Sequence, residues 1–385
     1  MAGIYIHIPF CKQACHYCDF HFSTSLKKKE EMIAALKTEI TLRKTEFENS
    51  PVETIYFGGG TPSILSVAEI NDLIQQVYAH YTVVSNPEIT LEANPDDLDT
   101  DVFEQYKAIG INRLSIGVQS FFEEDLQLMN RAHNATEAEK CIREATVYFD
   151  NITIDLIYGI PNMTNERWLQ NVQKALDFGI PHISSYALTV EPKTALASFI
   201  AKGTVPDVDD AVAQEHFYLL VDTLANNGFI HYELSNFGKP DYFSKNNTAY
   251  WLGKKYIGIG PSAHSYNGVQ RSWNIANNTK YIKSLQEGIL PAEVETLTLT
   301  DRYNEAIMTG LRTIWGVSVN RVQQEFGDTC HNYLLEQAAK PVEHGLLALE
   351  TTPHGTVLKT TAKGKFLADG LASDLFLLNL EETAE

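Results

Sequence analysis

Apolar and polar positions in the first half of the chain form short apolar runs separated by longer stretches with helical spacing. The runs predict strands at Ile4–Phe10, Thr54–Phe57, Ile89–Ala93, Arg113–Val118, Ile152–Tyr158 and Ile183–Thr189. The stretches between them predict helices at Lys28–Phe47, Val67–Tyr81, Asp99–Ile109, Thr136–Phe149 and Glu166–Phe178. Strands that alternate with helices in this way indicate βα units and a parallel sheet. Several strands are apolar on both faces, as parallel strands covered on both sides are.

Six βα units predict an α/β fold that is an incomplete version of the eight-unit (β/α) barrel. An open doubly wound sheet is the alternative, and periodicity alone does not separate the two. Gly, Pro and polar residues gather where the predicted strands end, for example at Gly58–Pro62, Glu92–Pro95 and Tyr158–Pro161. Because ligands bind at this rim in parallel α/β folds, we expect one shared site there.

The alternation stops near residue 195. An amphipathic helix is predicted at Asp209–Asn227, and Tyr232–Tyr266 is rich in aromatic residues, Asn and Gly. Further helices are predicted at Arg302–Ile314, Val319–Phe326 and Thr329–His344, and Leu346–Leu349 with Val357–Thr360 predicts a hairpin. Helices followed by a hairpin resemble a winged-helix domain. We therefore expect a (β/α)6 core at residues 1–195, an extension at 196–295 and a C-terminal winged-helix-like domain at 296–385.

The net charge of the chain limits the classes of partner that it can bind. There are 30 Lys and Arg residues against 49 Asp and Glu residues, a formal net charge of -19. Nucleic-acid binding normally requires a basic face, so we expect no nucleic-acid partner. The chain has no apolar run of about 18 residues and no secretory signal pattern. We expect a cytoplasmic protein without a membrane span, and docking at membrane complexes stays open.

Three of the five cysteines, Cys11, Cys15 and Cys18, form a CxxxCxxC array. Three thiolates on one loop can bind three irons of a [4Fe–4S] cluster and leave the fourth iron open. The alternative is a zinc ion with His16 as the fourth ligand, although the adjacent Cys15 and His16 would have difficulty reaching one tetrahedral ion. We expect Cys141 and Cys330 to be small buried apolar side chains.

The cysteine array combines with further motifs: YIHIPFC (Tyr5–Cys11), GGGTP (Gly58–Pro62), GVQS (Gly117–Ser120) and DLIYGIP (Asp155–Pro161). Together they resemble the radical S-adenosylmethionine superfamily, and more narrowly the branch shared by oxygen-independent coproporphyrinogen III oxidases and haem chaperones. This resemblance spans nearly the whole chain and implies a partial (β/α)6 TIM-type barrel with a [4Fe–4S] cluster. It also implies that S-adenosylmethionine binds the open iron and that its cleavage yields a 5′-deoxyadenosyl radical.

The resemblance also assigns contacts to S-adenosylmethionine. We expect Gly58–Gly60 to leave the backbone open for its methionine moiety. Glu92 is a candidate acceptor for the ribose hydroxyls or the amino group. The implied contacts are Tyr5, Tyr17, Gly59, Gly60, Thr61, Glu92, Gln119, Arg131, Asp155 and Ala187.

Within this branch, smaller features favour the haem-chaperone type. The oxidases have a longer segment before the cluster and a further cysteine two residues after the third ligand, where this chain has Phe20. The chaperone type implies haem or a porphyrin as cargo, a haem-recipient apoprotein such as a respiratory enzyme, and a cellular electron donor. Whether the protein is itself an enzyme stays open.

The haem-associated motif of the chaperone type is His-Asn-x-x-Tyr-Trp, and here its first position is Asn246, a poor iron ligand. Asn247, Tyr250 and Trp251 are candidates to line a porphyrin face, with a packed aromatic turn as the alternative. The candidate axial ligands that remain are His216, His231 and His264.

The alternative function is an oxygen-independent coproporphyrinogen III oxidase that converts propionates to vinyl groups by radical decarboxylation. Its substrate would need cationic partners. Available ones are Arg113, Arg131, Arg271 and the Lys254–Lys255 pair. A radical enzyme that acts on tRNA is disfavoured by the negative charge.

Overall fold

Six parallel strands form the centre of the computed structural model, which describes residues 2–47 and 50–378. They are β1 (Ala2–Ile8), β2 (Val52–Gly59), β3 (Val83–Ala93), β4 (Arg113–Gln119), β5 (Ile152–Tyr158) and β6 (His182–Ala187). Each strand pairs in parallel with the next one along the chain. This order defines a partial barrel, because a doubly wound sheet reverses its strand order at one point. The (β/α)6 prediction is confirmed, and the doubly wound alternative is wrong.

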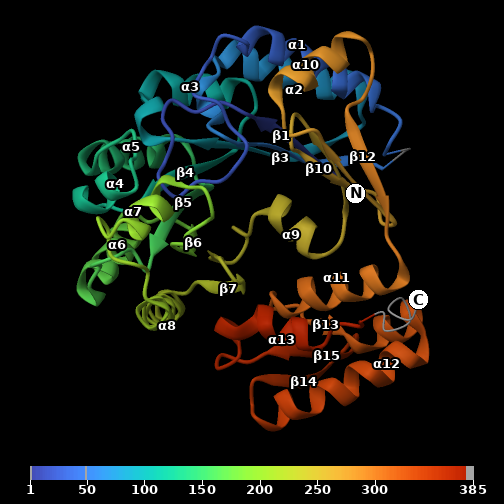
Figure 1. The fold of residues 1–385 in the computed structure, drawn as a ribbon. Helices are drawn as coiled ribbons and strands as arrows, with labels where there is room; N and C mark the ends of the chain where they lie inside the picture. The colour runs from blue at the N-terminus through green and yellow to red at the C-terminus, as the bar shows by residue number, and fades with distance from the viewer. Residues whose placement is uncertain (1, 48–49, 379–385) are drawn as a thin grey trace.

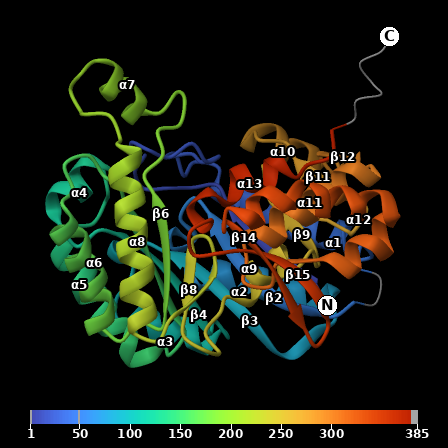
Figure 2. The ribbon, with the colours of Figure 1, turned by 90° about the horizontal axis from the view of Figure 1, so that it is seen from below.

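Helices cover the outer face of this curved sheet (Figures 1 and 2). The longer ones are α1 (Lys29–Leu42), α2 (Val67–His80), α3 (Thr100–Ala108), α5 (Ala135–Tyr148), α6 (Asn165–Asp177) and α8 (Asp210–Asn226). Capping boxes at Ser66 and Asn134 fix the starts of α2 and α5 by satisfying free backbone N–H groups. The short α4 (Glu123–Leu128) and α7 (Ala195–Ala201) were not predicted, because one or two turns carry little periodicity.

The extension adds strands to both edges of the barrel sheet. On one side β9 (Lys255–Ile259) pairs in parallel with β1, and β10 (His264–Tyr266), β11 (Gln270–Asn274) and β12 (Ala292–Thr296) follow antiparallel. On the other side β8 (Asn236–Gly238) pairs with β6, and β7 (Ile230–Glu233) pairs with β8. The result is one 12-stranded sheet whose ends are β12 and β7. The helix α9 (Lys245–Trp251) lies in the opening between these ends (Figure 1).

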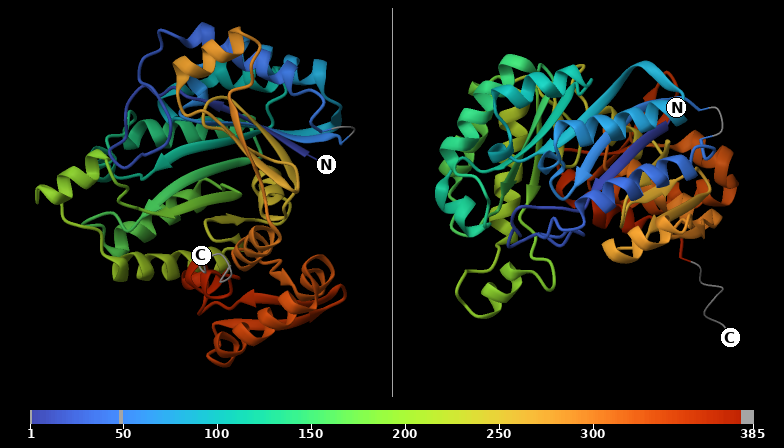
Figure 3. Two further views of the ribbon diagram at one scale, coloured as in Figure 1. Left: turned by 45° about the vertical axis from the view of Figure 1, so that its right-hand side comes forward. Right: turned by 90° about the horizontal axis from the view of Figure 1, so that it is seen from above.

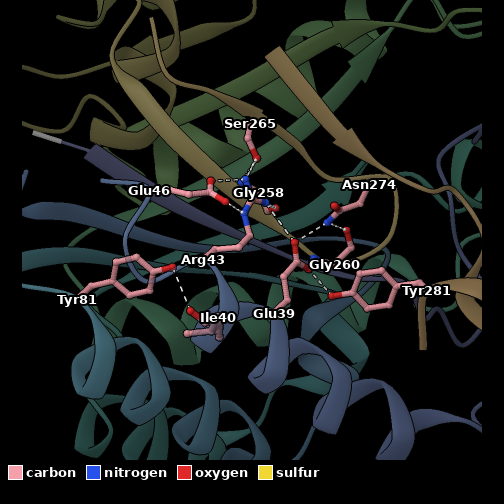
Figure 4. A network of polar contacts seen from close by, with 10 residues as sticks. All are labelled: Glu39, Ile40, Arg43, Glu46, Tyr81, Gly258, Gly260, Ser265, Asn274 and Tyr281. Carbon is pink, nitrogen blue, oxygen red and sulfur yellow. Dashed lines mark hydrogen bonds and ion pairs between the residues drawn. The ribbon is translucent and has the colours of Figure 1, made fainter. Parts of the chain in front are cut away.

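A buried ion pair joins α1 to the added strands (Figure 4). The Arg43 guanidinium donates to Glu39 Oε1 at 3.1 Å, to the Gly258 carbonyl at 2.8 Å and to Ser265 Oγ at 2.9 Å. Glu39 in turn accepts from Asn274 Nδ2 at 2.7 Å, and from the Gly260 N–H and the Tyr281 hydroxyl, the latter on α10 (Asn278–Gln286). Because both charges are compensated, this network can fasten the extension to the barrel from within the core.

The C-terminal residues form a separate apolar cluster that includes Ile307, Leu334 and Leu358. Its elements are α11 (Leu299–Leu311), β13 (Val317–Ser318), α12 (Val319–Glu343), β14 (Leu347–Thr352), β15 (Gly355–Thr360) and α13 (Ala368–Asp374). Gly327 breaks α12 with a φ of 85°, as the separate helices predicted on either side of it require. Helices followed by the β14–β15 hairpin confirm the winged-helix-like fold, which lies below the barrel in the left view of Figure 3. The exact three-part division of the chain stays a prediction.

Within the described residues, no helix is both long and apolar enough to span a bilayer. Cys141 and Cys330 are buried, with 2% and 5% of their surface exposed, as predicted for small apolar side chains.

Candidate functional site

A cavity of about 490 Å³ lies at the carboxyl ends of the barrel strands. Its walls come from the loop after β1 and from the ends of β2 to β6, which is the rim where the sequence predicts a shared site. All but one of the predicted contacts for S-adenosylmethionine line it: Tyr17, Gly59, Gly60, Thr61, Glu92, Gln119, Arg131, Asp155 and Ala187. The fold therefore gathers side chains that are up to 170 residues apart in the sequence.

The three clustered cysteines line the same cavity as free, partly exposed thiols. Arg131 donates from Nη1 to Cys15 Sγ at 3.2 Å and from Nη2 to Asn94 Oδ1 at 2.7 Å and to the Gly117 carbonyl at 2.8 Å. Burial raises the pKa of the Cys11 thiol to about 11. A fixed guanidinium against one sulfur stabilises the thiolate that a metal requires. This donor set fits three ligands of a [4Fe–4S] cluster.

His16 does not join the thiols. Its Nδ1 donates to the Leu128 carbonyl at 2.9 Å, and its ring packs edge-on against Phe199 on α7. Among residues 2–47 and 50–378, no three His, Cys, Asp or Glu side chains are placed as ligands of a single ion. The position of His16 disfavours the zinc alternative.

Two partly buried carboxyl groups, Glu92 and Asp155, face the cavity. The Tyr56 hydroxyl donates to Glu92 Oε1 at 2.7 Å and the Gly59 N–H donates to Oε2 at 3.2 Å. Burial raises the pKa of Glu92 to about 7, and burial raises that of Asp155 to about 6 against the opposing charges of Arg113 and Arg131. Each group therefore gains or loses its proton near neutral pH, and a cationic ligand would favour the ionised form of both.

Tyr5 is the predicted contact that does not line the cavity. Its ring stacks on Tyr56 with centroids 6.0 Å apart, and its hydroxyl is 3.3 Å from His7 Nδ1. Tyr5 therefore packs against Tyr56, whose hydroxyl donates to Glu92. Tyr56 and Asn94, which bond to Glu92 and Arg131, were not predicted as site residues. The period of two along a strand places Tyr56 on the same face as Gly58, which was a signal for it.

The glycines at 58–60 are also packed closely against the chain itself. A Cβ on Gly58 would lie 2.8 Å from Tyr5 Cε2, and a Cβ on Gly60 would lie 2.5 Å from the Phe10 carbonyl. Gly59 has a φ of 107°, and a Cβ there would overlap the His7 ring. Packing of the chain against itself is therefore enough to require glycine, and approach by a ligand stays a prediction.

The predicted haem segment divides between two environments. Tyr250 and Trp251 line a second cavity of about 490 Å³ between the extension and the C-terminal domain, whereas Asn247 does not line it. Asn246 is buried: its Oδ1 accepts from Thr54 Oγ1 at 3.0 Å and its N–H donates to Glu88 Oε1 at 3.1 Å. The segment forms the short helix α9 where a turn was the alternative, and its aromatic residues are packed: Tyr250 lies edge-on to Tyr256 with ring centroids 4.5 Å apart, and the Arg312 guanidinium lies 5.3 Å from the centre of the Trp251 ring.

The three candidate histidine ligands lie apart from both cavities. His216 Nδ1 accepts from the Gly159 N–H at 3.2 Å, and His231 stacks on Phe237 with centroids 4.0 Å apart. The His264 ring lies 6.1 Å from that of Trp273. The structure therefore brings none of them to Tyr250 and Trp251.

Comparison with known proteins agrees with this architecture. Residues 5–175 match the family described as the radical SAM superfamily, and residues 297–367 match the HemN C-terminal domain. The chain is 32% identical to a protein named heme chaperone HemW from Mycobacterium tuberculosis, over 97% of this chain and 94% of that protein. The HemW proteins of Bacillus subtilis (32%, covering 96% and 100%) and Escherichia coli (31%, covering 95% and 98%) are similarly related.

Among solved structures, coproporphyrinogen III oxidase (HemN) of Escherichia coli has a TM-score of 0.83 and 23% identity, covering 97% of this chain and 90% of that one. At this identity the match shows the shared fold. The fold and the cysteine-lined cavity place the chain in the radical S-adenosylmethionine superfamily, whose cofactors are a [4Fe–4S] cluster and S-adenosylmethionine. Within that superfamily the chain belongs to the HemW family.

Proposed function

We propose that this protein is a haem chaperone of the cytoplasm, which takes up haem as cargo and delivers it to haem-requiring apoproteins, including respiratory enzymes. Cys11, Cys15 and Cys18 would hold the [4Fe–4S] cluster, and the surrounding strand ends would bind S-adenosylmethionine. When bound, this pair supplies one-electron chemistry at the open iron, for which a cellular electron donor is the partner. The runner-up is the coproporphyrinogen III oxidase.

The charge of the cluster cavity carries the choice between these two functions. Four acidic side chains line it: Asp19, Glu92, Asp155 and Glu191. The cation on its wall is Arg131, whose guanidinium already bonds Cys15, Asn94 and Gly117. Coproporphyrinogen carries several propionate carboxylates, and an acidic wall repels them. This cavity suits a cationic sulfonium ligand better than a polyanionic substrate.

The other cations that an oxidase could use do not reach the cluster cavity. Arg113 is 1% exposed and donates to Thr153 inside the barrel. Lys254 pairs with Glu53 at 3.5 Å, and Lys255 does not line the cavity. Arg271 lines the second cavity and pairs with Glu305. The side chains that could neutralise propionates are therefore directed away from the cluster.

The residues of the chain prepare the cluster cavity in two ways. Arg131 orients Cys15 and offsets the negative charge that accumulates on three thiolates. The carboxyl groups of Glu92 and Asp155, whose pKa values are raised, ionise when a cationic ligand replaces the water around them. Both roles concern the binding of the cofactors, and neither requires that the protein converts a substrate.

The test is anaerobic reconstitution followed by two parallel assays on one preparation. We expect about one haem bound per chain, measured by the Soret band, and no vinyl product from coproporphyrinogen with S-adenosylmethionine and a reductant. Reconstituted coproporphyrinogen oxidase from Escherichia coli serves as the positive control for the second assay. Vinyl formation without haem uptake would replace the chaperone with the oxidase.

A further inference from the structure

The second cavity has walls from two parts of the chain. The extension contributes α9 and the strands β9 to β11, and the C-terminal domain contributes α11, β13 and α12. Six aromatic side chains line it: Tyr250, Trp251, Tyr256, Tyr266, Trp315 and Phe326. Its volume of about 490 Å³ is within the range of small-molecule sites, and aromatic walls favour a flat unsaturated ligand.

Three arginines, Arg271, Arg302 and Arg321, also line this cavity. Arg271 pairs with Glu305, and Arg321 Nε donates to Glu325 Oε1 at 2.7 Å. Arg302 differs from both: its Nε is buried without a hydrogen-bond partner, and within residues 2–47 and 50–378 its side chain makes no ion pair. A guanidinium left uncompensated in a protein of net charge -19 is available to an anionic ligand.

We propose that the second cavity binds a planar aromatic dicarboxylate, a porphyrin held through its carboxylates by Arg302 and through its ring faces by the aromatic wall. That the porphyrin is haem rests on the proposed function. Arg271 and Arg321 are secondary partners, because a ligand carboxylate must first displace Glu305 or Glu325 from them. Arg302 is the anchor because it needs no such exchange.

This arrangement makes recognition independent of iron. No histidine or cysteine in the described part of the chain lines the cavity. Its polar aromatic groups are the phenols of Tyr250, Tyr256 and Tyr266 and the indole N–H groups of Trp251 and Trp315. The Tyr266 hydroxyl already donates to the Gly268 carbonyl at 3.0 Å. A metal-free porphyrin should therefore bind about as tightly as haemin, because carboxylates and ring faces supply the contacts in both.

The test titrates haemin, protoporphyrin IX and haemin dimethyl ester into the full-length protein and follows quenching of tryptophan fluorescence. Trp251 and Trp315 line the cavity and report on it directly. Arg302→Gln should weaken haemin and protoporphyrin IX about tenfold, as loss of a charge-assisted hydrogen bond does, and leave the ester unchanged. Arg143→Gln, an exposed arginine on α5, is the matched control and should change nothing.

The outcomes separate this inference from the proposed function. If haemin binds wild type and Arg302→Gln equally, the cavity assignment is wrong while haem binding stands. If protoporphyrin IX binds through Arg302 but haemin does not bind, the porphyrin site stands and the haem-chaperone function is wrong. If the wild type binds neither, both are wrong. Arg302→Lys should recover part of the affinity, which shows that charge rather than folding is responsible.

Discussion

The cluster cavity and the second cavity have the same volume, about 490 Å³, and opposite chemical character. The cluster cavity presents three thiols and four acidic side chains with one arginine, whose Nη1 and Nη2 groups already donate hydrogen bonds to Cys15, Asn94 and Gly117. The second cavity presents six aromatic rings, three arginines and two glutamates. The difference fits the division of labour that we propose, with cofactors at the strand ends and an anionic, planar cargo between the extension and the C-terminal domain.

The two cavities also differ in how the chain builds them. The cluster cavity uses the ends of consecutive barrel strands, and most of its lining residues come from residues 5–175, which match the radical SAM superfamily. The second cavity uses the extension and the domain that matches the HemN C-terminal domain. A barrel that handles cofactors is thus combined with a separate surface that can be adapted to cargo.

Removing one cluster thiol gives the largest expected effect. Cys15→Ala should abolish the cluster, because two thiolates do not hold it and the Arg131 contact loses its partner. Iron and sulfide analysis after anaerobic reconstitution measures this, with Cys141→Ala, a buried cysteine far from the cavity, as the control. Porphyrin binding should persist in Cys15→Ala. Loss of both together would mean that the two cavities are not independent.

The buried network that fastens the extension to the barrel predicts a loss of stability. Glu39→Ala should lower the free energy of unfolding by about 3–5 kcal/mol, because it removes the buried carboxylate that pairs with the buried Arg43. Denaturant unfolding measures this. Glu46→Gln, which removes the half-exposed partner of Arg43, should cost less than about 1 kcal/mol. Equal losses in the two variants would contradict a role for burial.

The raised pKa values of Glu92 and Asp155 predict a pH dependence in each state of the protein. Without a ligand, each group stabilises the folded state when it is protonated. The contribution of Glu92 is full below its ordinary pKa of 4.5 and is lost as pH rises through about 7, and that of Asp155 is full below 3.8 and is lost as pH rises through about 6. Binding of cationic S-adenosylmethionine has the opposite sign and should strengthen from about pH 5.5 to 7.5. Calorimetry across this range measures it.

Variants at the two carboxyl groups sharpen that prediction. Glu92→Gln should flatten the pH dependence near pH 7, and Asp155→Asn should weaken binding by at most about 1.5–3 kcal/mol through loss of a charge-assisted hydrogen bond. If both variants bind S-adenosylmethionine like wild type at every pH, the cavity is not its site.

The smallest expected effects come from substitutions in α9. Trp251→Ala should weaken porphyrin binding by about 1 kcal/mol, because it removes one aromatic face of the second cavity. Asn246→Ala should leave the haem spectrum unchanged, because this side chain is buried against Thr54 and away from the cavity. A shifted Soret band in Asn246→Ala would place the iron next to this residue.

The sequence predicted the barrel well because each βα unit carries its own periodicity and the strands pair in chain order. The cysteine array and the strand-end motifs likewise located the cluster cavity, because parallel strands bring their carboxyl ends to one edge. The pairing of β9 with β1 could not be predicted, since no local pattern specifies a partner about 250 residues away.

The second cavity could not be predicted from the sequence for the same physical reason. Tyr250 and Trp251 were identified by a motif, but Arg302 and Arg321 adjoin them only after α11 and α12 pack against the extension. Tyr5 was expected to contact the ligand but does not line the cluster cavity, whereas Gly59 does line it. A sequence motif marks a position near a site and does not say which of its residues line the cavity.

The most direct test of two separate sites is a haemin titration of the reconstituted protein with and without saturating S-adenosylmethionine. The structure predicts that both ligands bind together and that the haemin dissociation constant changes by less than about twofold. Competition between the two ligands, in which added S-adenosylmethionine raises the haemin dissociation constant about tenfold or more, would place both in the cluster cavity and contradict the account.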